Sequence, residues 1–187
     1  MTSLLSRILG ARDATPANEV GLEPAPTTRL RVLMVCMGNI CRSPTAHGVF
    51  RHHVRQAGLA HAVRVDSAGT HNYHPGEPPD ERSQQHAARR GYDLSDLRAR
   101  QLREEDFEAH DLILVMDWDN LALVQAECPP QHQHKVRRFT EFCQRLDATV
   151  VPDPYYGGAQ GFDHVLDLVE DASVGLVRFV VRRVGRG

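Results

Sequence analysis

The sequence lacks the marks of a membrane protein, a disulfide scaffold and a nucleic-acid binder. Its 187 residues contain no apolar run of about 18 residues, so we expect no membrane span. The formal net charge of −2 provides no general attraction to nucleic acid. The four cysteines include no Cys-x-x-Cys pair, which is typical of a reduced, cytosolic protein. We therefore predict a cytoplasmic protein without a nucleic-acid partner.

The N-terminal stretch differs from the rest of the chain. Arg7 and Arg12 interrupt its apolar part, so it makes a poor signal peptide. Residues 13–28 are rich in proline, alanine, threonine and glutamate, as linkers are. We predict a flexible tail over residues 1–29, one domain over residues 30–183 and a short tail over residues 184–187.

Apolar runs alternate with helical patterns through the predicted domain. Four runs indicate strands, at residues 30–36, 62–69, 111–117 and 135–139. Four stretches have helical spacing, at residues 43–58, 78–91, 118–128 and 161–183. Two charge-rich stretches, 103–111 and 137–146, are predicted to be solvated surfaces. The alternation predicts an α/β fold with a doubly wound, four-stranded parallel sheet flanked by helices.

The string C-x-G-N-x-C-R-S-P begins at Cys36, where the first strand ends. Ligands of doubly wound sheets bind beyond the carboxyl ends of the strands. Gly38 and Asn39 permit unusual backbone angles, which allow a turn to aim several N–H groups inward around an anion. The helix that begins at Pro44 adds its positive dipole end, and Arg42 can close a planar fork over two oxygens. The string therefore predicts a cradle for a tetrahedral oxyanion.

The same cradle suits nucleophilic catalysis by Cys36. It favours the thiolate and holds a dianion over the sulfur, which fits attack on a phosphoryl group with a cysteinyl-phosphate intermediate. The alternative is a small core cysteine, but the full string is far more restrictive than a lone cysteine. Asp153 stands between two prolines in a second loop and is a candidate general acid, or an ordinary turn residue.

The two loops together resemble those of the low-molecular-weight protein tyrosine phosphatases, and the resemblance covers roughly Leu30 to Arg183. It includes the strings "VDSAGT", "GEPPDERS" and "VPDPYYGGAQGFDHV". It implies hydrolysis of phosphotyrosine without a metal or other cofactor. It also implies Cys36 as nucleophile, Arg42 as phosphate ligand and Asp153 as general acid and base.

The resemblance implies roles for neighbouring residues as well. Asn39 would hold the loop in a strained shape, Ser43 would hydrogen-bond the thiolate, and Ser67 would support Asn39. The remaining members of the phosphate-binding loop would be Met37, Gly38, Ile40 and Cys41. Cys41 would form a protective disulfide with the nucleophile under oxidation, or is a small buried residue.

Two aromatic residues stand where the family has pocket walls. Tyr73 and Tyr155 would flank a deep phosphate site and select a flat aryl phosphate. Tyr73 could instead pack within its own proline-rich loop. The pair Tyr155–Tyr156 resembles one that some relatives have phosphorylated. The chain departs from the family at Arg90 and Leu97, where relatives often have histidine. The departure at Arg90 leaves open how the hydrogen bonds that hold Asn39 are completed.

Other functions leave weaker signals. None of the eleven histidines has convincing metal-ligand spacing, so no metal is expected. Arsenate reductases share this loop but use a nearby downstream cysteine pair, and none lies between Cys41 and Cys128. A phosphotyrosine-binding module without turnover is a third hypothesis. The resemblance implies a phosphotyrosine-containing protein as partner, with a bacterial tyrosine autokinase as one candidate, and we expect a monomer.

Overall fold

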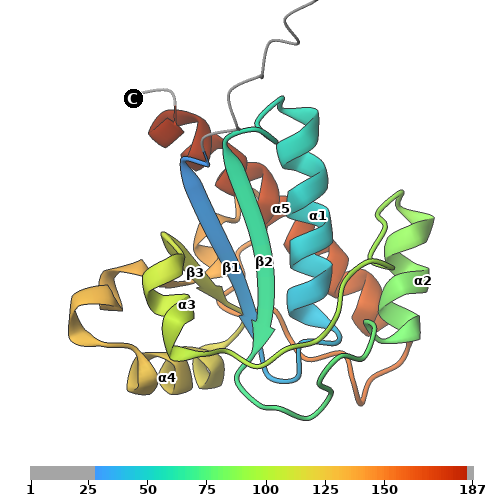
Figure 1. The fold of residues 1–187 in the computed structure, drawn as a ribbon. Helices are drawn as coiled ribbons and strands as arrows, with labels where there is room; N and C mark the ends of the chain where they lie inside the picture. The colour runs from blue at the N-terminus through green and yellow to red at the C-terminus, as the bar shows by residue number, and fades with distance from the viewer. Residues whose placement is uncertain (1–27, 185–187) are drawn as a thin grey trace, which may run out of the picture.

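Four parallel strands form the sheet of this protein. The computed structural model describes residues 28–184, so most of the predicted N-terminal tail lies outside the described residues. The sheet has the order β2-β1-β3-β4 and consists of β1 (Leu30–Cys36), β2 (Val63–Gly69), β3 (Leu112–Val115) and β4 (Val136–Arg138). The predicted four-stranded parallel sheet is confirmed (Figure 1).

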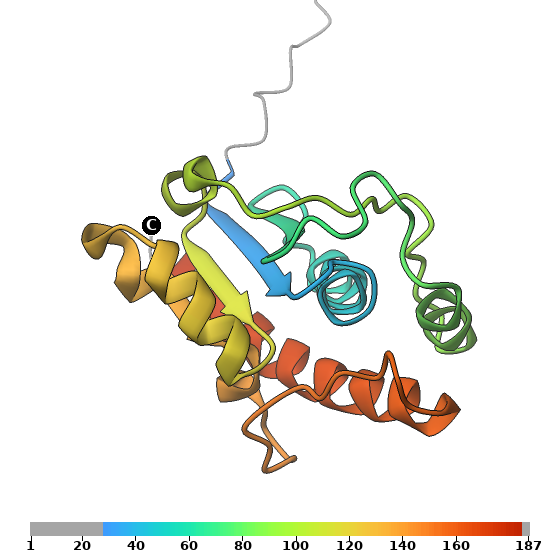
Figure 2. The same ribbon diagram turned by 90° about the horizontal axis from the view of Figure 1, so that it is seen from below.

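Helices cover both faces of the sheet, as a doubly wound fold requires. On one side lie α1 (Arg42–Gln56), α2 (Glu81–Arg89) and α5 (Ala159–Val184). On the other lie α3 (Glu104–Ala109) and α4 (Trp118–Glu127). Two 3₁₀ turns flank β4, η1 (Pro130–Lys135) and η2 (Phe139–Phe142). Figure 2 shows the sheet between these two helical layers.

Strand β1 is the centre of the hydrophobic core. Val32 and Met34 point to one side, where they join the buried residues of α1 and α5. Leu33 and Val35 point to the other side and pack in the cluster that contains Val124 of α4. All four of these β1 residues are fully buried, which explains why this strand is a continuous apolar run.

The carboxyl ends of β1 and β2 meet at one edge of the molecule. Cys36 is paired with Gly69 in the parallel register, so the loops that follow these strands lie side by side. A Cβ at Gly69 would lie 2.7 Å from the Met37 carbonyl oxygen, a distance that no side chain tolerates. Gly69 therefore allows the loop after β1 to pack against the end of β2.

The two charge-rich stretches, which are predicted to be solvated, contain aromatic residues that are buried. Residues 103–111 contain α3, and Phe107 of this helix is buried in the cluster that contains Val124. Residues 137–146 contain η2, where Phe139 and Phe142 are buried in the larger of the two core clusters, the one that contains Val32, Met34 and the buried residues of α1 and α5. The prediction of solvated surfaces is wrong for these aromatic residues, because each short helix turns its phenylalanine side chains into the core; in α3 the charged Asp106 is buried as well.

Asp171 stabilises the chain reversal after η2. It lies on α5 and is almost completely buried. Its Oδ2 accepts hydrogen bonds of 2.9 Å from the backbone N–H groups of Gln144, Arg145 and Leu146. Burial alone would raise the pKa of Asp171, but these donors outweigh burial and hold the pKa below its ordinary value.

Replacement of Asp171 by asparagine should destabilise the fold. We expect Asp171→Asn to lower the free energy of unfolding at pH 7 by about 2 kcal/mol, because three donors lose a charged acceptor. The contribution is fully present above the unfolded-state pKa and is lost as pH falls through the lower folded-state pKa. Urea denaturation at pH 7 and pH 3 measures this difference. Asp147→Asn is the control and should change stability little, because Asp147 is an exposed residue in the chain reversal that Asp171 binds. An Asp171→Asn protein as stable as the wild type would contradict this role.

Candidate active site

The loop between β1 and α1 is held in a strained conformation around Asn39. Among residues 28–184, Asn39 is the one non-glycine residue with a positive φ, at 56°. Its side-chain amide donates to Ser43 Oγ at 2.8 Å, and its side-chain carbonyl accepts the backbone N–H of Arg100 at 3.0 Å. Asn39 is thus fixed from α1 on one side and from the 98–102 segment on the other.

Cys36 stands at the base of this loop. Its side chain is buried, and its Sγ lies 3.1 Å from Ser43 Oγ. Ser43 also lies 3.3 Å from the carbonyl oxygen of Ala68. The hydroxyl that fixes Asn39 is therefore also the neighbour of the sulfur, and it can donate to a thiolate at this position.

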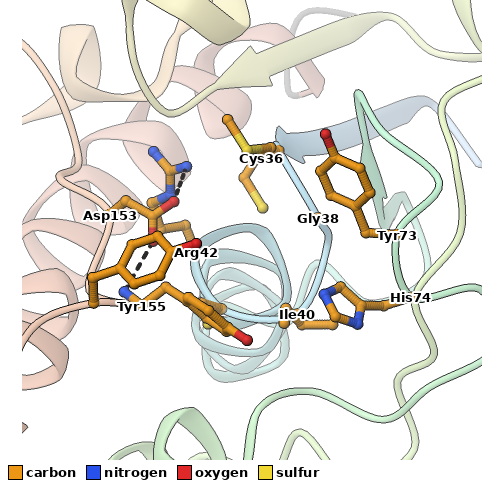
Figure 3. Close-up of a pocket in the computed structure, with 11 residues that line it drawn as sticks. Cys36, Gly38, Ile40, Arg42, Tyr73, His74, Asp153 and Tyr155 are labelled. Carbon is orange, nitrogen blue, oxygen red and sulfur yellow. Dashed lines mark hydrogen bonds and ion pairs between the residues drawn. The ribbon is translucent and has the colours of Figure 1, made fainter.

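A pocket of about 200 Å³ opens above Cys36. The loop after β1 forms its floor, and Tyr73 and Tyr155 stand on opposite walls (Figure 3). Tyr73 stacks on His71 of its own loop, with 4.9 Å between ring centroids, and is still 61% exposed. His74 follows Tyr73 directly and also lines the pocket, although it is not among the predicted pocket residues.

Arg42 is buried between two carboxylates. Its Nη1 pairs with Asp117 and its Nη2 lies 2.6 Å from Asp153 Oδ2. Burial alone would lower the pKa of Arg42, but Cys36 and the two carboxylates outweigh it and raise the pKa above its ordinary value. Asp117 is not among the predicted site residues, although it follows β3 at the edge where ligands bind in this fold.

Asp153 comes from the loop before α5 and reaches the pocket from the side opposite Tyr73 (Figure 3). Its Oδ2 pairs with Arg42, and its Oδ1 accepts the backbone N–H of Tyr155 at 3.0 Å. The side chain is 43% exposed. In the free protein the Asp153 carboxylate is paired with the Arg42 guanidinium, which the sequence predicts to bind an oxyanion. An oxyanion that binds Arg42 therefore has to compete with Asp153.

Ser67, which the resemblance places in support of Asn39, has a different hydrogen-bond partner in this structure. Its Oγ lies 3.3 Å from Nδ1 of His47, and among residues 28–184 no hydrogen bond joins it to Asn39. The carbonyl of the Asn39 side chain is taken by Arg100 instead. Burial and the charge of Arg51 lower the pKa of His47 to about 4, so the imidazole that Ser67 contacts is neutral near pH 7.

The two departures from the family pattern lie away from the loop network. Arg90 pairs with Asp167 at 2.7 Å and with Glu170 at 2.9 Å, both on α5. Leu97 is buried in the larger core cluster. The backbone of Arg100 completes the Asn39 network, and it needs neither position.

Cys41 is a buried free thiol on the pocket floor. Burial and the nearby charge of Asp80 raise the pKa of Cys41 to about 12, which keeps it protonated near pH 7. All four cysteines are free in this structure. Disulfide formation between Cys36 and Cys41 stays a prediction.

The described residues contain neither a cluster of metal ligands nor a helix that could span a membrane. Within residues 28–184, no group of three or more histidine, cysteine or acidic side chains is placed to hold a metal ion. Over the same range, no helix combines the length and the apolar character needed to cross a membrane.

The chain matches the family model described as low molecular weight phosphotyrosine protein phosphatase over residues 31–186. A low molecular weight protein-tyrosine-phosphatase of Streptomyces coelicolor is 43% identical over 157 residues, which cover 82% of this chain and 95% of that protein. A protein tyrosine phosphatase structure from Entamoeba histolytica has 38% identity and a TM-score of 0.79, covering 84% of this chain and 99% of that one. Wzb of Vibrio vulnificus, solved in complex with benzylphosphonate, has 27% identity and a TM-score of 0.70, covering 80% and 97%.

Removal of the carboxylate at position 153 should strengthen oxyanion binding. We expect Asp153→Asn to bind orthovanadate about fivefold more tightly than the wild type, because Arg42 then loses a competing anion. Isothermal titration measures the dissociation constants. Glu77→Gln is the control, since Glu77 pairs with His74 at 2.8 Å on the pocket rim, and it should leave the affinity unchanged. Weaker vanadate binding by Asp153→Asn would show that Asp153 does not compete for Arg42.

Proposed function

The chain belongs to the low molecular weight phosphotyrosine protein phosphatases, and from this premise we propose that it hydrolyses its substrates through a phosphocysteine on Cys36. Asp153 is the proton donor and Arg42 the phosphate ligand in this proposal. The observation that carries it is the convergence of a sulfur, a buried guanidinium and a partly exposed carboxyl group on one small pocket. Each of the three comes from a different segment, and each has a distinct task in phosphoryl transfer.

In the first step the sulfur of Cys36 attacks phosphorus. The phosphate dianion lies among the backbone N–H groups of the loop, and Arg42 binds two of its oxygens in place of Asp153. The S–P bond forms as the P–O bond to the phenol breaks. Asp153, released from Arg42 and protonated, donates its proton to the departing oxygen. The charge of the transition state is spread over donors already in position.

In the second step water regenerates the thiolate. The carboxylate of Asp153 accepts a proton from a water molecule, which attacks phosphorus from the side that the phenol has left. The S–P bond breaks, and inorganic phosphate forms. Ser43 Oγ, 3.1 Å from Cys36 Sγ, donates a hydrogen bond to the departing thiolate and lowers the energy of this step.

The pocket walls favour an aryl phosphate. Tyr73 and Tyr155 present ring surfaces on two sides of the pocket, and a phenyl ring between them loses apolar surface to water on both faces. Wzb of Vibrio vulnificus holds benzylphosphonate, which carries the same pairing of ring and tetrahedral anion. Bacterial relatives support phosphoprotein substrates in a bacterial cell, and we include a tyrosine autokinase in the cytoplasm as a candidate partner.

Hydrolysis of 4-nitrophenyl phosphate without added metal tests the mechanism. We expect turnover by the wild type, none by Cys36→Ser, and a 10²- to 10⁴-fold lower kcat for Asp153→Ala, because kcat includes the second step, in which Asp153 acts as general base whatever the leaving group. Cys128→Ser changes another buried cysteine outside the pocket and should retain activity.

Two results would contradict the proposal. One is an inactive wild type after fresh reduction. The other is activity retained by Cys36→Ser. Phosphotyrosine peptide binding without release of phosphate would then indicate a binding module, and thioredoxin-coupled reduction of arsenate would indicate a reductase.

A further inference from the structure

The start of α2 is anchored to the floor of the pocket. Asp80 is the N-cap residue of α2, and its Oδ1 accepts the backbone N–H of Arg82 at 2.8 Å. The backbone N–H of Asp80 donates to the carbonyl oxygen of Ile40 at 2.8 Å. Ile40 belongs to the loop that follows Cys36, so the first turn of α2 has a fixed position relative to the nucleophile.

Arg82 extends this anchor to the loop that carries Asp153. Its Nε and Nη2 donate to the two carboxylate oxygens of Asp80 at 3.1 and 2.9 Å, which fixes the plane of the guanidinium. Its Nη1 donates to the backbone carbonyl of Tyr155 at 3.1 Å. The guanidinium also lies 4.7 Å from the ring centroid of Phe162 and 5.5 Å from that of Tyr155.

Tyr155 completes the connection to the acid. Its backbone N–H donates to Asp153 Oδ1 at 3.0 Å, while its backbone carbonyl is held by Arg82. An unbroken series of contacts therefore runs from Ile40 through Asp80, Arg82 and Tyr155 to Asp153. The series joins the wall that carries the acid to the floor that carries the nucleophile, and Arg82 is its central member.

The phosphate-bound state depends on this series more than the free state does. In the free state Asp153 is also held by Arg42, and that contact has to break when phosphate occupies Arg42. On the N-terminal side of Asp153, the loop is bound to the residue that follows β3, because the Val151 N–H donates to the Met116 carbonyl at 2.7 Å. On the C-terminal side of Asp153, the hydrogen bond from Arg82 to the Tyr155 carbonyl does not involve Arg42, so it can persist when phosphate binds.

We propose that Arg82 is a positioning residue that holds Asp153 at the distance from the leaving oxygen that proton donation requires. The inference rests on the proposed function of Asp153 as general acid. Arg82 acts through the backbone of Tyr155 and does not contact the substrate phosphate. Its loss frees the loop after the acid, and a displacement of about 1 Å in a catalytic group can cost up to about 10²-fold in rate.

The dependence of rate on the leaving group tests this role. The value of kcat/KM reports the step in which the P–O bond breaks. Phenol leaves poorly without a proton, whereas 4-nitrophenol needs little protonation. We expect Arg82→Ala to lower kcat/KM for phenyl phosphate about tenfold more than for 4-nitrophenyl phosphate, and to leave vanadate affinity within about twofold. Arg89→Ala is the matched control, because Arg89 is an exposed arginine of the same helix.

Two further measurements separate positioning from a general loss of structure. Arg82→Lys keeps the charge but not the planar fork, so its ratio of the two kcat/KM values should lie between those of the wild type and Arg82→Ala. Hydrogen exchange at the Tyr155 amide, followed by NMR, should be faster in Arg82→Ala, and this result does not depend on turnover.

The outcomes are distinguishable. Equal losses on the two substrates, or unchanged exchange at Tyr155, would overturn the role of Arg82 and leave the phosphatase mechanism intact, provided that the wild type turns over and Cys36→Ser does not. Absence of wild-type turnover would overturn the proposed function and this inference together.

Discussion

The active site depends on the left-handed backbone of Asn39. A positive φ at this residue lets the loop after β1 turn tightly enough to meet the start of α1. Few side chains accept this conformation, and asparagine is among them because its short amide can bond locally. Here the amide reaches Ser43, which is also the neighbour of Cys36, and the carbonyl reaches Arg100. The strain is therefore offset by hydrogen bonds that also hold Ser43 beside the sulfur of Cys36.

Electrostatics then determine what the loop binds. Arg42 pairs with both Asp117 and Asp153, so in the free protein two carboxylates already face the guanidinium that would bind an anion. In the proposed mechanism Asp117 stays on Arg42 and fixes its direction, while Asp153 leaves. The same carboxyl group then competes with phosphate and afterwards serves the leaving group, so the mechanism couples substrate binding to release of the acid. In our further inference, the contacts of Arg82 limit how far that acid moves.

Much of the site could be predicted from sequence because it is contiguous. The string from Cys36 to Ser43 and the rigid Asp153 loop contain their chemistry in a few adjacent residues, and the parallel sheet follows from the alternation of apolar runs and helices. Asp117 and Arg82 could not be found this way, because their partners are 75 and 73 residues away in sequence. Arg100 acts on Asn39 through its backbone, which no side-chain pattern reveals. The buried phenylalanines of α3 and η2 were hidden by the charges around them.

Identification of the phosphorylated residue during turnover tests the central claim most directly. Wild-type protein mixed with an aryl phosphate and quenched rapidly in acid can be digested and analysed by mass spectrometry. The account predicts one added phosphoryl group on the peptide that contains Cys36, bound to sulfur, and none in Cys36→Ser. Turnover without a phosphorylated Cys36, or with phosphate on another residue, would contradict the covalent mechanism and the assignment of the nucleophile.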